Sequence, residues 1–192
     1  MPRTVWHITF GTYGKRMHGD EKPTVDRTNN RFGTAYLAPD FERERIERGM
    51  MGAPEVQFSF EQRVFLEAEI PVICVRGGWR YIQCAAEVDH VHTLLGIDRA
   101  IHGKQARPWL KRWITEALDT RRRAVKRTDG MSWFCEGGST LAVHDAEYFR
   151  NAYRYIRAQR ATAVVRDGEL GVLDTRGDDS GRIRPVSPSE GT

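Results

Sequence analysis

Residues 87–95 read Glu-Val-Asp-His-Val-His-Thr-Leu-Leu, and two histidines separated by one residue lie between apolar flanks. Side chains alternate between the two faces of a β-strand, so His90 and His92 are expected to point the same way. Val91 is then expected on the opposite face with Leu95. Two imidazoles on one side of a sheet are a plausible pair of metal ligands. Two histidines held by ordinary hydrogen bonds are the alternative, and this stretch alone does not exclude them.

Outward from this stretch, the sequence alternates between strand and helix signals. In chain order we expect a strand over 4–13, a long connection over 14–54, a helix from 60 to the glycine pair at 77–78, strands over 79–88 and 90–97, a helix over 107–125, a short strand over 132–136 and a helix from 146 to about 165. The order β-α-β-β-α-β predicts a ferredoxin-like α+β fold, in which two helices cover one face of an antiparallel sheet. The last helix is an addition to that fold.

The helix that begins at residue 60 combines a strong start signal with a proline in its interior. Ser59 and Gln62 have the spacing of a capping box. Pro71 is expected to kink or break the helix, because proline lacks the N–H that a helix interior needs. The helical stripe expected to face the core consists of Phe60, Val64, Phe65, Ala68, Val72 and Val75. Within the long connection, acidic residues predict the first turn of a short helix around 39–48.

The chain has 192 residues, of which 40% are hydrophobic, and this is enough for one domain with a real core. We assign the domain to residues 1–166, with the long loop over 14–54 as an insertion. Residues 167–192 are rich in Gly, Asp, Ser, Pro and Arg, which predicts a flexible tail. No run approaches the roughly 18–20 apolar residues of a membrane span, and the N-terminus lacks the apolar stretch of a signal peptide. The scattered cysteines contain no Cys-x-x-Cys pair, which favours a cytoplasmic protein.

The formal net charge of +4 is unevenly distributed along the chain. Basic residues gather between 104 and 127 and again on the last helix, whereas the tail leans acidic. This distribution favours a polyanionic partner, with nucleic acid as the first candidate. A solvated helix face is the alternative. The residues expected to contact nucleic acid are Lys104, Arg107, Lys111, Arg112, Arg150, Arg154 and Arg157.

The last helix carries three tyrosines, and one of them has a distinctive partner. Tyr155 is followed four residues later by Gln159, and this spacing places both side chains on one helix face. Tyr148 belongs to the same stripe, whereas Tyr153 lies on a stripe better suited to packing. Packing is the alternative for any single tyrosine. A tyrosine and a carboxamide, taken together with the histidine pair, favour a catalytic site.

In this combination the chain resembles the single-tyrosine HUH transposases, which are histidine–hydrophobic–histidine nucleases that act on single-stranded DNA. Among them it looks closest to the REP-associated tyrosine transposases. The resemblance rests on Trp6-His7-Ile8-Thr9-Phe10, Thr12-Tyr13-Gly14, Gly19-Asp20, Asp89-His90-Val91-His92 and the run from Tyr155 to Gln159. These motifs occur in the family's order over about residues 4–163. Gln159 resembles the glutamine of the insertion-sequence branch, because the nearest relatives usually carry Asn with a following Pro there.

The resemblance implies a metal-dependent enzyme that cleaves and rejoins single-stranded DNA through a covalent 5′-phosphotyrosine intermediate. Tyr155 would be the nucleophile, carried by the additional C-terminal helix. His90, His92 and Gln159 would hold a divalent metal, Mg²⁺ or Mn²⁺. The implied partner is single-stranded DNA with imperfect hairpins, and a homodimer is a possible assembly. No membrane partner is expected.

Two other functions remain open at this point. A hairpin-binding protein descended from such an enzyme would keep the fold without cutting nucleic acid. A metal phosphodiesterase would use the histidines with water, and Tyr155 would then be dispensable. A zinc deaminase is disfavoured, because the sequence lacks both His-x-Glu and Pro-Cys-x-x-Cys.

Overall fold

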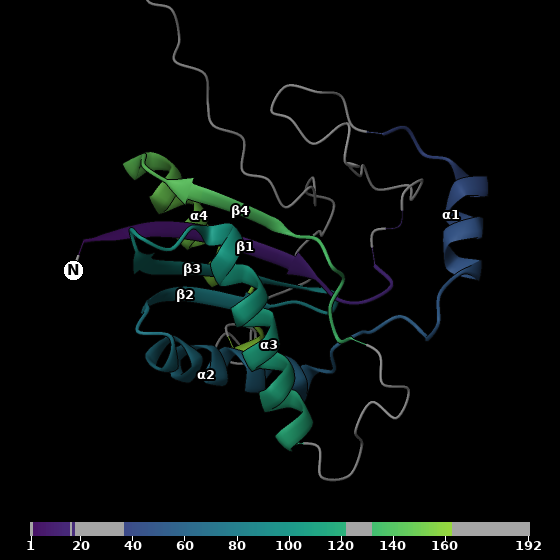
Figure 1. Ribbon diagram of the computed structural model, residues 1–192, viewed down its shortest axis with the longest axis horizontal. Helices are drawn as coiled ribbons and strands as arrows, with labels where there is room; N and C mark the ends of the chain where they lie inside the picture. The colour runs from purple at the N-terminus through teal and green to yellow at the C-terminus, as the bar shows by residue number, and fades with distance from the viewer. Residues whose placement is uncertain (1, 16, 18–36, 122–131, 163–192) are drawn as a thin grey trace, which may run out of the picture.

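The computed structural model describes residues 2–15, 17, 37–121 and 132–162, which form an α+β protein (Figure 1). The elements in chain order are β1 Arg3–Gly11, α1 Phe41–Gly49, α2 Phe60–Arg76, β2 Arg80–Ala86, β3 His90–Asp98, α3 Gly103–Arg121, β4 Ser139–Val143 and α4 Ala146–Ala158. The tail over 167–192 and a large part of the long connection lie outside the described residues. Among the helices of the described residues, none is long and apolar enough to cross a membrane.

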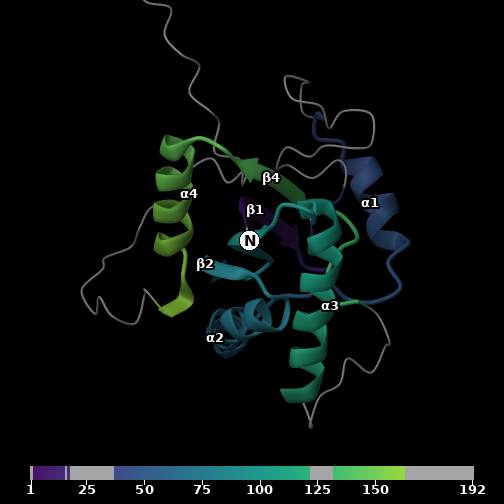
Figure 2. The ribbon, with the colours of Figure 1, turned by 60° about the vertical axis from the view of Figure 1, so that its left-hand side comes forward.

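One four-stranded sheet organises these elements, and its strand order is β2-β3-β1-β4. Every neighbouring pair of strands is antiparallel. Along the chain, α2 connects β1 to β2 and α3 connects β3 to β4, so the predicted ferredoxin-like β-α-β-β-α-β fold is confirmed. Figure 2 shows α2 and α3 on one side of the sheet and α4 on the other.

The main hydrophobic core fills the space between the sheet and the α2–α3 layer. Strand β1 contributes Trp6, Ile8 and Phe10, because alternate residues of a strand point to one face. Strand β3 contributes Val91 and Leu95 to the same core. Both strands therefore present their other set of alternating residues to the opposite face of the sheet.

A second, smaller hydrophobic cluster lies on that opposite face, beneath α4. Ala152 and Ile156 of α4 are buried there against Ala85 of β2 and Leu94 of β3. This packing fixes the middle of α4 against the two strands. The even-numbered residues of β3, which include both histidines, consequently face α4.

The interior of α2 corrects one of the two expectations for its proline, because the helix does not break there. The helix continues through Pro71 from Phe60 to Arg76. Proline cannot donate to the carbonyl four residues earlier, which belongs to Glu67. The thiol of Cys84 donates to that carbonyl at 3.8 Å instead. A neighbouring strand thus supplies the hydrogen bond that the proline removes.

The predicted core face of α2 was also wrong. The hydrophobic residues that α2 buries are Leu66, Ile70, Ile73 and Cys74. Four residues assigned to the core are exposed, namely Phe60, Ala68, Val72 and Val75. Two neighbouring stripes of this helix are apolar, and a sheet can cover one of them. Periodicity alone does not say which stripe the sheet covers.

The fourth strand lies after the glycine pair at 137–138 and not over 132–136, as its sequence suggested. Trp133 and Phe134 are buried in the main core, where their rings lie 6.3 and 6.0 Å from the ring of Phe58. Gly138 has φ of +140°, and a Cβ there would lie 2.6 Å from a β1 carbonyl oxygen. Glycine therefore allows the chain to turn tightly against β1 before β4 begins.

Two helix boundaries also differ from the predictions. Helix α3 begins at Gly103 and not at residue 107. A Cβ on Gly103 would lie 2.5 Å from the ring of Trp6, so glycine lets this first turn approach the ring closely. Helix α4 ends at Ala158, earlier than the expected end near 165, and Gln159 is its C-cap.

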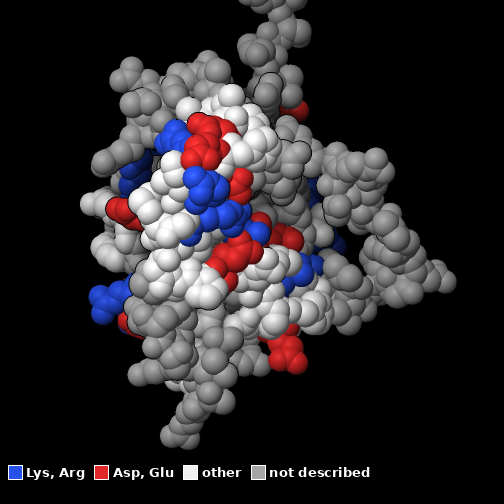
Figure 3. Space-filling model, turned by 90° about the vertical axis from the view of Figure 1, so that its right-hand side faces the viewer, with Lys and Arg blue, Asp and Glu red and all other residues white. Residues whose placement is uncertain are grey.

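The short helix expected around 39–48 is confirmed as α1. Asp40 is its N-cap, and the carboxylate accepts a hydrogen bond from the N–H of Arg43. Ion pairs within the helix join Arg43 to Glu47, Arg45 to Glu42 and Arg48 to Glu44. Figure 3 shows the side of the molecule that carries α1, where acidic and basic side chains are interspersed.

Candidate active site

His90 and His92 lie on the same face of β3, as their spacing predicts. Their ring centroids are 4.6 Å apart with the rings nearly perpendicular. Both side chains are buried, with exposed fractions of 6% and 0%. Nδ1 of His90 is 2.6 Å from the carboxylate of Asp89. Its buried Nε2 has no hydrogen-bond partner among the described residues.

The Nδ1 atom of His92 is held by β1, the neighbouring strand. Thr9 lies directly opposite His92 in the strand register, and its Oγ1 is 2.9 Å from Nδ1. Nε2 of His7 lies 3.4 Å from the same atom. A metal-binding histidine typically donates its other ring N–H to a neighbour, which fixes the ring orientation. Thr9 is in place to accept that hydrogen bond, so Nε2 is the nitrogen through which His92 would bind a metal.

The network continues from His7 to α4. Nδ1 of His7 is 2.8 Å from the hydroxyl of Tyr148. Burial lowers the pKa of His7 to about 4 and raises the pKa of Tyr148 to about 12, so both groups are neutral at pH 7. His7 lies beside Thr9 on the face of β1 away from the main core, and it is not among the site residues predicted from the sequence. The contact with Tyr148 depends on where α4 docks.

Tyr155 of α4 lies beside His92 of the histidine pair. Its ring centroid is 5.5 Å from that of His92, with the rings nearly perpendicular. Tyr148 lies two helical turns earlier on the same side of α4 and contacts His7. Tyr153 instead stacks with Phe149, at a centroid distance of 6.4 Å. The structure thus separates Tyr155, whose ring lies beside His92, from Tyr153, which stacks with Phe149 and packs against the small cluster beneath α4.

Gln159 caps α4 one turn beyond Tyr155, and its backbone N–H donates to the carbonyl of Tyr155 at 3.2 Å. Its side-chain Oε1 is buried and has no hydrogen-bond partner in the part of the chain that the structure describes. A buried polar atom of this kind is costly and calls for a water, an ion or a ligand. The same holds for Nε2 of His90.

These donors fit a divalent metal. Imidazole nitrogens together with an amide oxygen and open positions suit Mn²⁺ or Mg²⁺, and the nitrogen ligands favour Mn²⁺. Within residues 2–15, 17, 37–121 and 132–162, no three His, Cys, Asp or Glu side chains are grouped to hold a metal. A third protein ligand would therefore come from another residue type, and the amide of Gln159 is the candidate that the sequence predicts.

The basic residues expected at the nucleic-acid surface fall on two sides of the molecule. Arg150, Arg154 and Arg157 are exposed on α4, on the same side of the sheet as the histidine pair. Residues Lys104, Arg107, Lys111 and Arg112 belong to α3, which covers the opposite side. The structure does not bring these two groups together.

Two of the α3 cations bind to the loop before β4. The ammonium of Lys111 donates to the carbonyl oxygens of Cys135, Glu136 and Gly137 at 2.6, 3.1 and 2.5 Å. Burial lowers the pKa of Lys111 to about 8. Arg107 donates to the carbonyl of Gly138. These contacts hold the loop against α3, which is a structural role that basic composition alone does not reveal.

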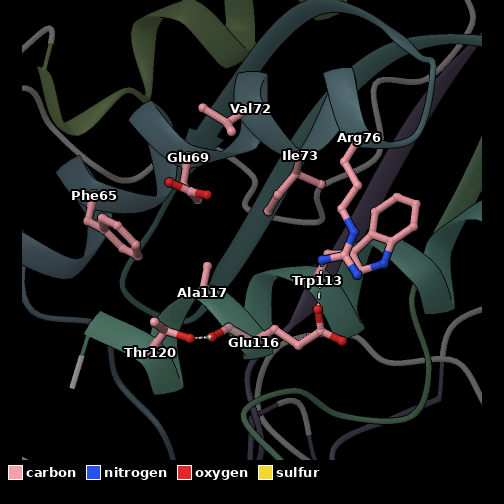
Figure 4. Close-up of a pocket in the computed structure, with 9 residues that line it drawn as sticks. All are labelled: Phe65, Glu69, Val72, Ile73, Arg76, Trp113, Glu116, Ala117 and Thr120. Carbon is pink, nitrogen blue, oxygen red and sulfur yellow. Dashed lines mark hydrogen bonds and ion pairs between the residues drawn. The ribbon is translucent and has the colours of Figure 1, made fainter. Parts of the chain in front are cut away.

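A hollow of about 470 Å³ lies between α2 and α3, on the side of the sheet away from the histidines (Figure 4). Trp113 lies in its wall with Arg76, whose guanidinium carbon is 5.0 Å from a ring centroid of Trp113. Arg76 also pairs with Glu116 at 2.7 Å. None of the candidate catalytic residues lines the hollow, so we do not assign the active site to it.

No protein-family model matches the sequence, and no curated protein matches it. Among solved structures, the chain is similar to a candidate transposase from Deinococcus radiodurans R1, with 15% identity and a TM-score of 0.43 over 83% of this chain and 93% of that one. It is also similar to a REP-associated tyrosine transposase bound to a REP hairpin, with 10% identity and a TM-score of 0.42 over 88% of this chain and 72% of that one.

Proposed function

We propose that this protein cleaves and rejoins single-stranded hairpin DNA in a metal-dependent reaction through a covalent phosphotyrosine on Tyr155. The observation that carries the proposal is the position of Tyr155 against His92, beside His90 and on the face that α4 covers. A metal phosphodiesterase that uses water does not explain why a tyrosine lies at this point. The resemblance of the sequence motifs to the single-tyrosine HUH transposases supports a 5′-phosphotyrosine and a free 3′-hydroxyl as the products of cleavage.

In the first step, the phenol of Tyr155 gives up its proton, and its oxygen attacks the scissile phosphorus to form a Tyr–O–P bond. The bond from phosphorus to the 3′ oxygen breaks, and this oxygen takes up a proton, which leaves a free 3′-hydroxyl and a 5′-phosphotyrosine. Rejoining reverses this exchange, because a 3′-hydroxyl attacks the phosphotyrosine and releases the phenol. One ester bond forms as another breaks, so the energy of the phosphodiester is kept.

His90, His92 and Gln159 would hold the metal, through the imidazole Nε2 atoms and the amide oxygen. When bound, the metal supplies polarisation of the scissile phosphate and offsets the charge that develops on it. With His7 neutral, Thr9 can accept from His92 Nδ1 while its hydroxyl donates to His7. This pattern keeps the Nε2 of His92 unprotonated, which is the form that a metal requires.

A covalent adduct tests the proposal. The protein is incubated with Mn²⁺ and a pool of single-stranded oligonucleotides that each carry an imperfect hairpin, with the label at either the 3′ or the 5′ end. We expect the 3′ label to migrate with the protein on a denaturing gel and the 5′ label to appear on a shorter free strand. Cleavage with no attached label would support the phosphodiesterase, and binding without cleavage would support the hairpin-binding protein.

Tyr148→Phe is expected to retain adduct formation, with a loss below about tenfold, the lower end of the effect of an outer-shell partner. Burial raises the pKa of Tyr148, and its hydroxyl is 2.8 Å from His7, so it is poorly suited to act as the nucleophile. The rate of adduct formation by this variant and by the parent is compared at equal Mn²⁺. Complete loss of the adduct in a folded Tyr148→Phe protein would move the nucleophile assignment to that residue.

Hairpin binding is expected to weaken steeply with salt, because the exposed arginines of α4 replace counterions on the DNA backbone. Replacing Arg154 and Arg157 by glutamine should reduce the slope of log affinity against log salt by about 1.4, from about 0.7 per contact on a single strand. The matched control replaces Lys104 and Arg112 on α3, which covers the opposite face, and should change the slope less. Equal slopes for the parent and the α4 variant would exclude this helix as the DNA surface.

A further inference from the structure

Glu67 is a buried carboxylate in the middle of α2, and its side chain is 0% exposed. Its Oε1 accepts hydrogen bonds from the backbone N–H of Ala161 at 2.8 Å and of Ala86 at 3.3 Å. Its Oε2 accepts from the hydroxyl of Thr162 at 3.0 Å and from Nε of Arg160 at 3.3 Å. A buried carboxylate is tolerated when its lone pairs are satisfied in this way.

These bonds join α2 to two parts of the chain that lie next to candidate metal ligands or their strand partners. Ala86 is on β2, next to Ala85, which lies opposite His92 in the strand register. Arg160 immediately follows Gln159 at the end of α4. The Glu67 carboxylate is therefore hydrogen-bonded to Ala86, beside the β2 residue that lies opposite His92. It is also hydrogen-bonded to Arg160, which directly follows Gln159.

Hydrophobic packing and hydrogen bonds both act at the C-terminal end of α4. The buried residues of α4 are Ala152 in the middle of the helix and Ile156 in its last turn, and Ala161 beyond the helix is also buried. Helix ends fray where few contacts hold them. The hydrogen bonds from residues 160–162 to Glu67 add to this packing and fix the chain directly after Gln159.

We propose that Glu67 is a positioning residue that holds the amide oxygen of Gln159 at the histidine pair and so completes the metal site within one chain. The proposal rests on the function proposed above. Glu67 acts through Gln159 and does not touch the metal. Its carboxylate fixes the residues that follow Gln159 against the strand that pairs with His92, so ligands from two distant parts of the sequence meet in one geometry.

Glu67→Gln tests this role, because it keeps the size of the side chain and removes acceptor capacity. The amide nitrogen of the new side chain would face the donors of residues 160–162. We expect Mn²⁺ affinity to fall about tenfold, within the range for loss of an outer-shell partner. Free Mn²⁺ is measured by its paramagnetic resonance signal, with Mn²⁺ alone and without DNA.

The decisive comparison repeats the substitution in a Gln159→Ala background. If Glu67 acts through Gln159, Glu67→Gln should lower Mn²⁺ affinity in the parent and have little further effect in the Gln159→Ala protein. Ile70→Val, a core change on the same helix, is the control and should leave the affinity unchanged. If Glu67→Gln fails to fold, Thr162→Val takes its place in the comparison. It removes one hydrogen-bond donor to Glu67 without altering the charge, and its effect on Mn²⁺ affinity should likewise disappear in the Gln159→Ala background.

The outcomes separate this proposal from the proposed function. Equal losses of affinity in both backgrounds would show that Glu67 merely supports the fold, and would overturn this proposal alone. A parent protein that binds no Mn²⁺, or binds it equally well after His92→Ala, would overturn the proposed function together with this proposal.

Discussion

Tyr155→Phe is expected to abolish the covalent protein–DNA adduct and metal-dependent strand cleavage together. The substitution removes one oxygen and keeps the ring that lies beside His92, so the packing of α4 should change little. The removed oxygen is the proposed nucleophile, and a phenyl ring cannot attack phosphorus. Mn²⁺ affinity and hairpin binding are measured on the same preparation and should stay close to those of the parent.

Tyr153→Phe is the matched control, since it makes the same change on the same helix. The ring of Tyr153 stacks with Phe149, whereas the ring beside His92 is that of Tyr155, so adduct formation should persist. Cleavage by Tyr155→Phe at the parent rate would contradict the phosphotyrosine mechanism. That result would favour water as the attacking group.

His92→Ala is expected to lower metal-dependent cleavage by at least about 100-fold, the upper end of the loss seen when an outer-shell partner is removed. The reason is that the proposed site loses one of two imidazole ligands, whereas the exposed arginines that would bind DNA are untouched. Cleavage, Mn²⁺ affinity and hairpin binding are measured separately. Binding should remain largely intact.

Because His92 is fully buried, the variant also leaves a cavity, and its folding is checked by circular dichroism before activity is compared. Thr9→Val is the matched control for this part of the sheet. It removes the acceptor of the His92 Nδ1 hydrogen bond but keeps the ligand, so its effect on Mn²⁺ affinity should be smaller. Loss of hairpin binding by a folded His92→Ala protein would contradict the division between metal site and DNA surface.

The local features of the fold and site could be predicted from sequence because they follow from short-range geometry. A strand places residues two apart on one face, and this was enough to put His90 and His92 together. A helix places residues four apart on one face, which predicts a common orientation for Tyr155 and Gln159; helix α4 ends at Ala158, and Gln159 is its C-cap. The ferredoxin-like order of elements followed from the places in the chain where the hydrophobic pattern changes between the period of a strand and the period of a helix.

The features that the sequence did not predict depend on tertiary contacts. Which apolar stripe of α2 meets the sheet is decided by docking, and Pro71 is tolerated because Cys84 supplies a hydrogen bond from another strand. The contact of His7 with Tyr148 needs the position of α4 on the sheet. The role of Glu67 needs residues that lie more than 90 positions away in the chain to come to it.

Peptide mapping of the covalent adduct tests the central claim most directly. Protein cross-linked to 3′-labelled hairpin DNA in the presence of Mn²⁺ is digested with protease and nuclease, and the modified peptide is sequenced by mass spectrometry. The account predicts a phosphotyrosine at Tyr155 that carries the 5′ end of the downstream strand. A modification at Tyr148 or Tyr153, or cleavage products with no modified peptide, would contradict it.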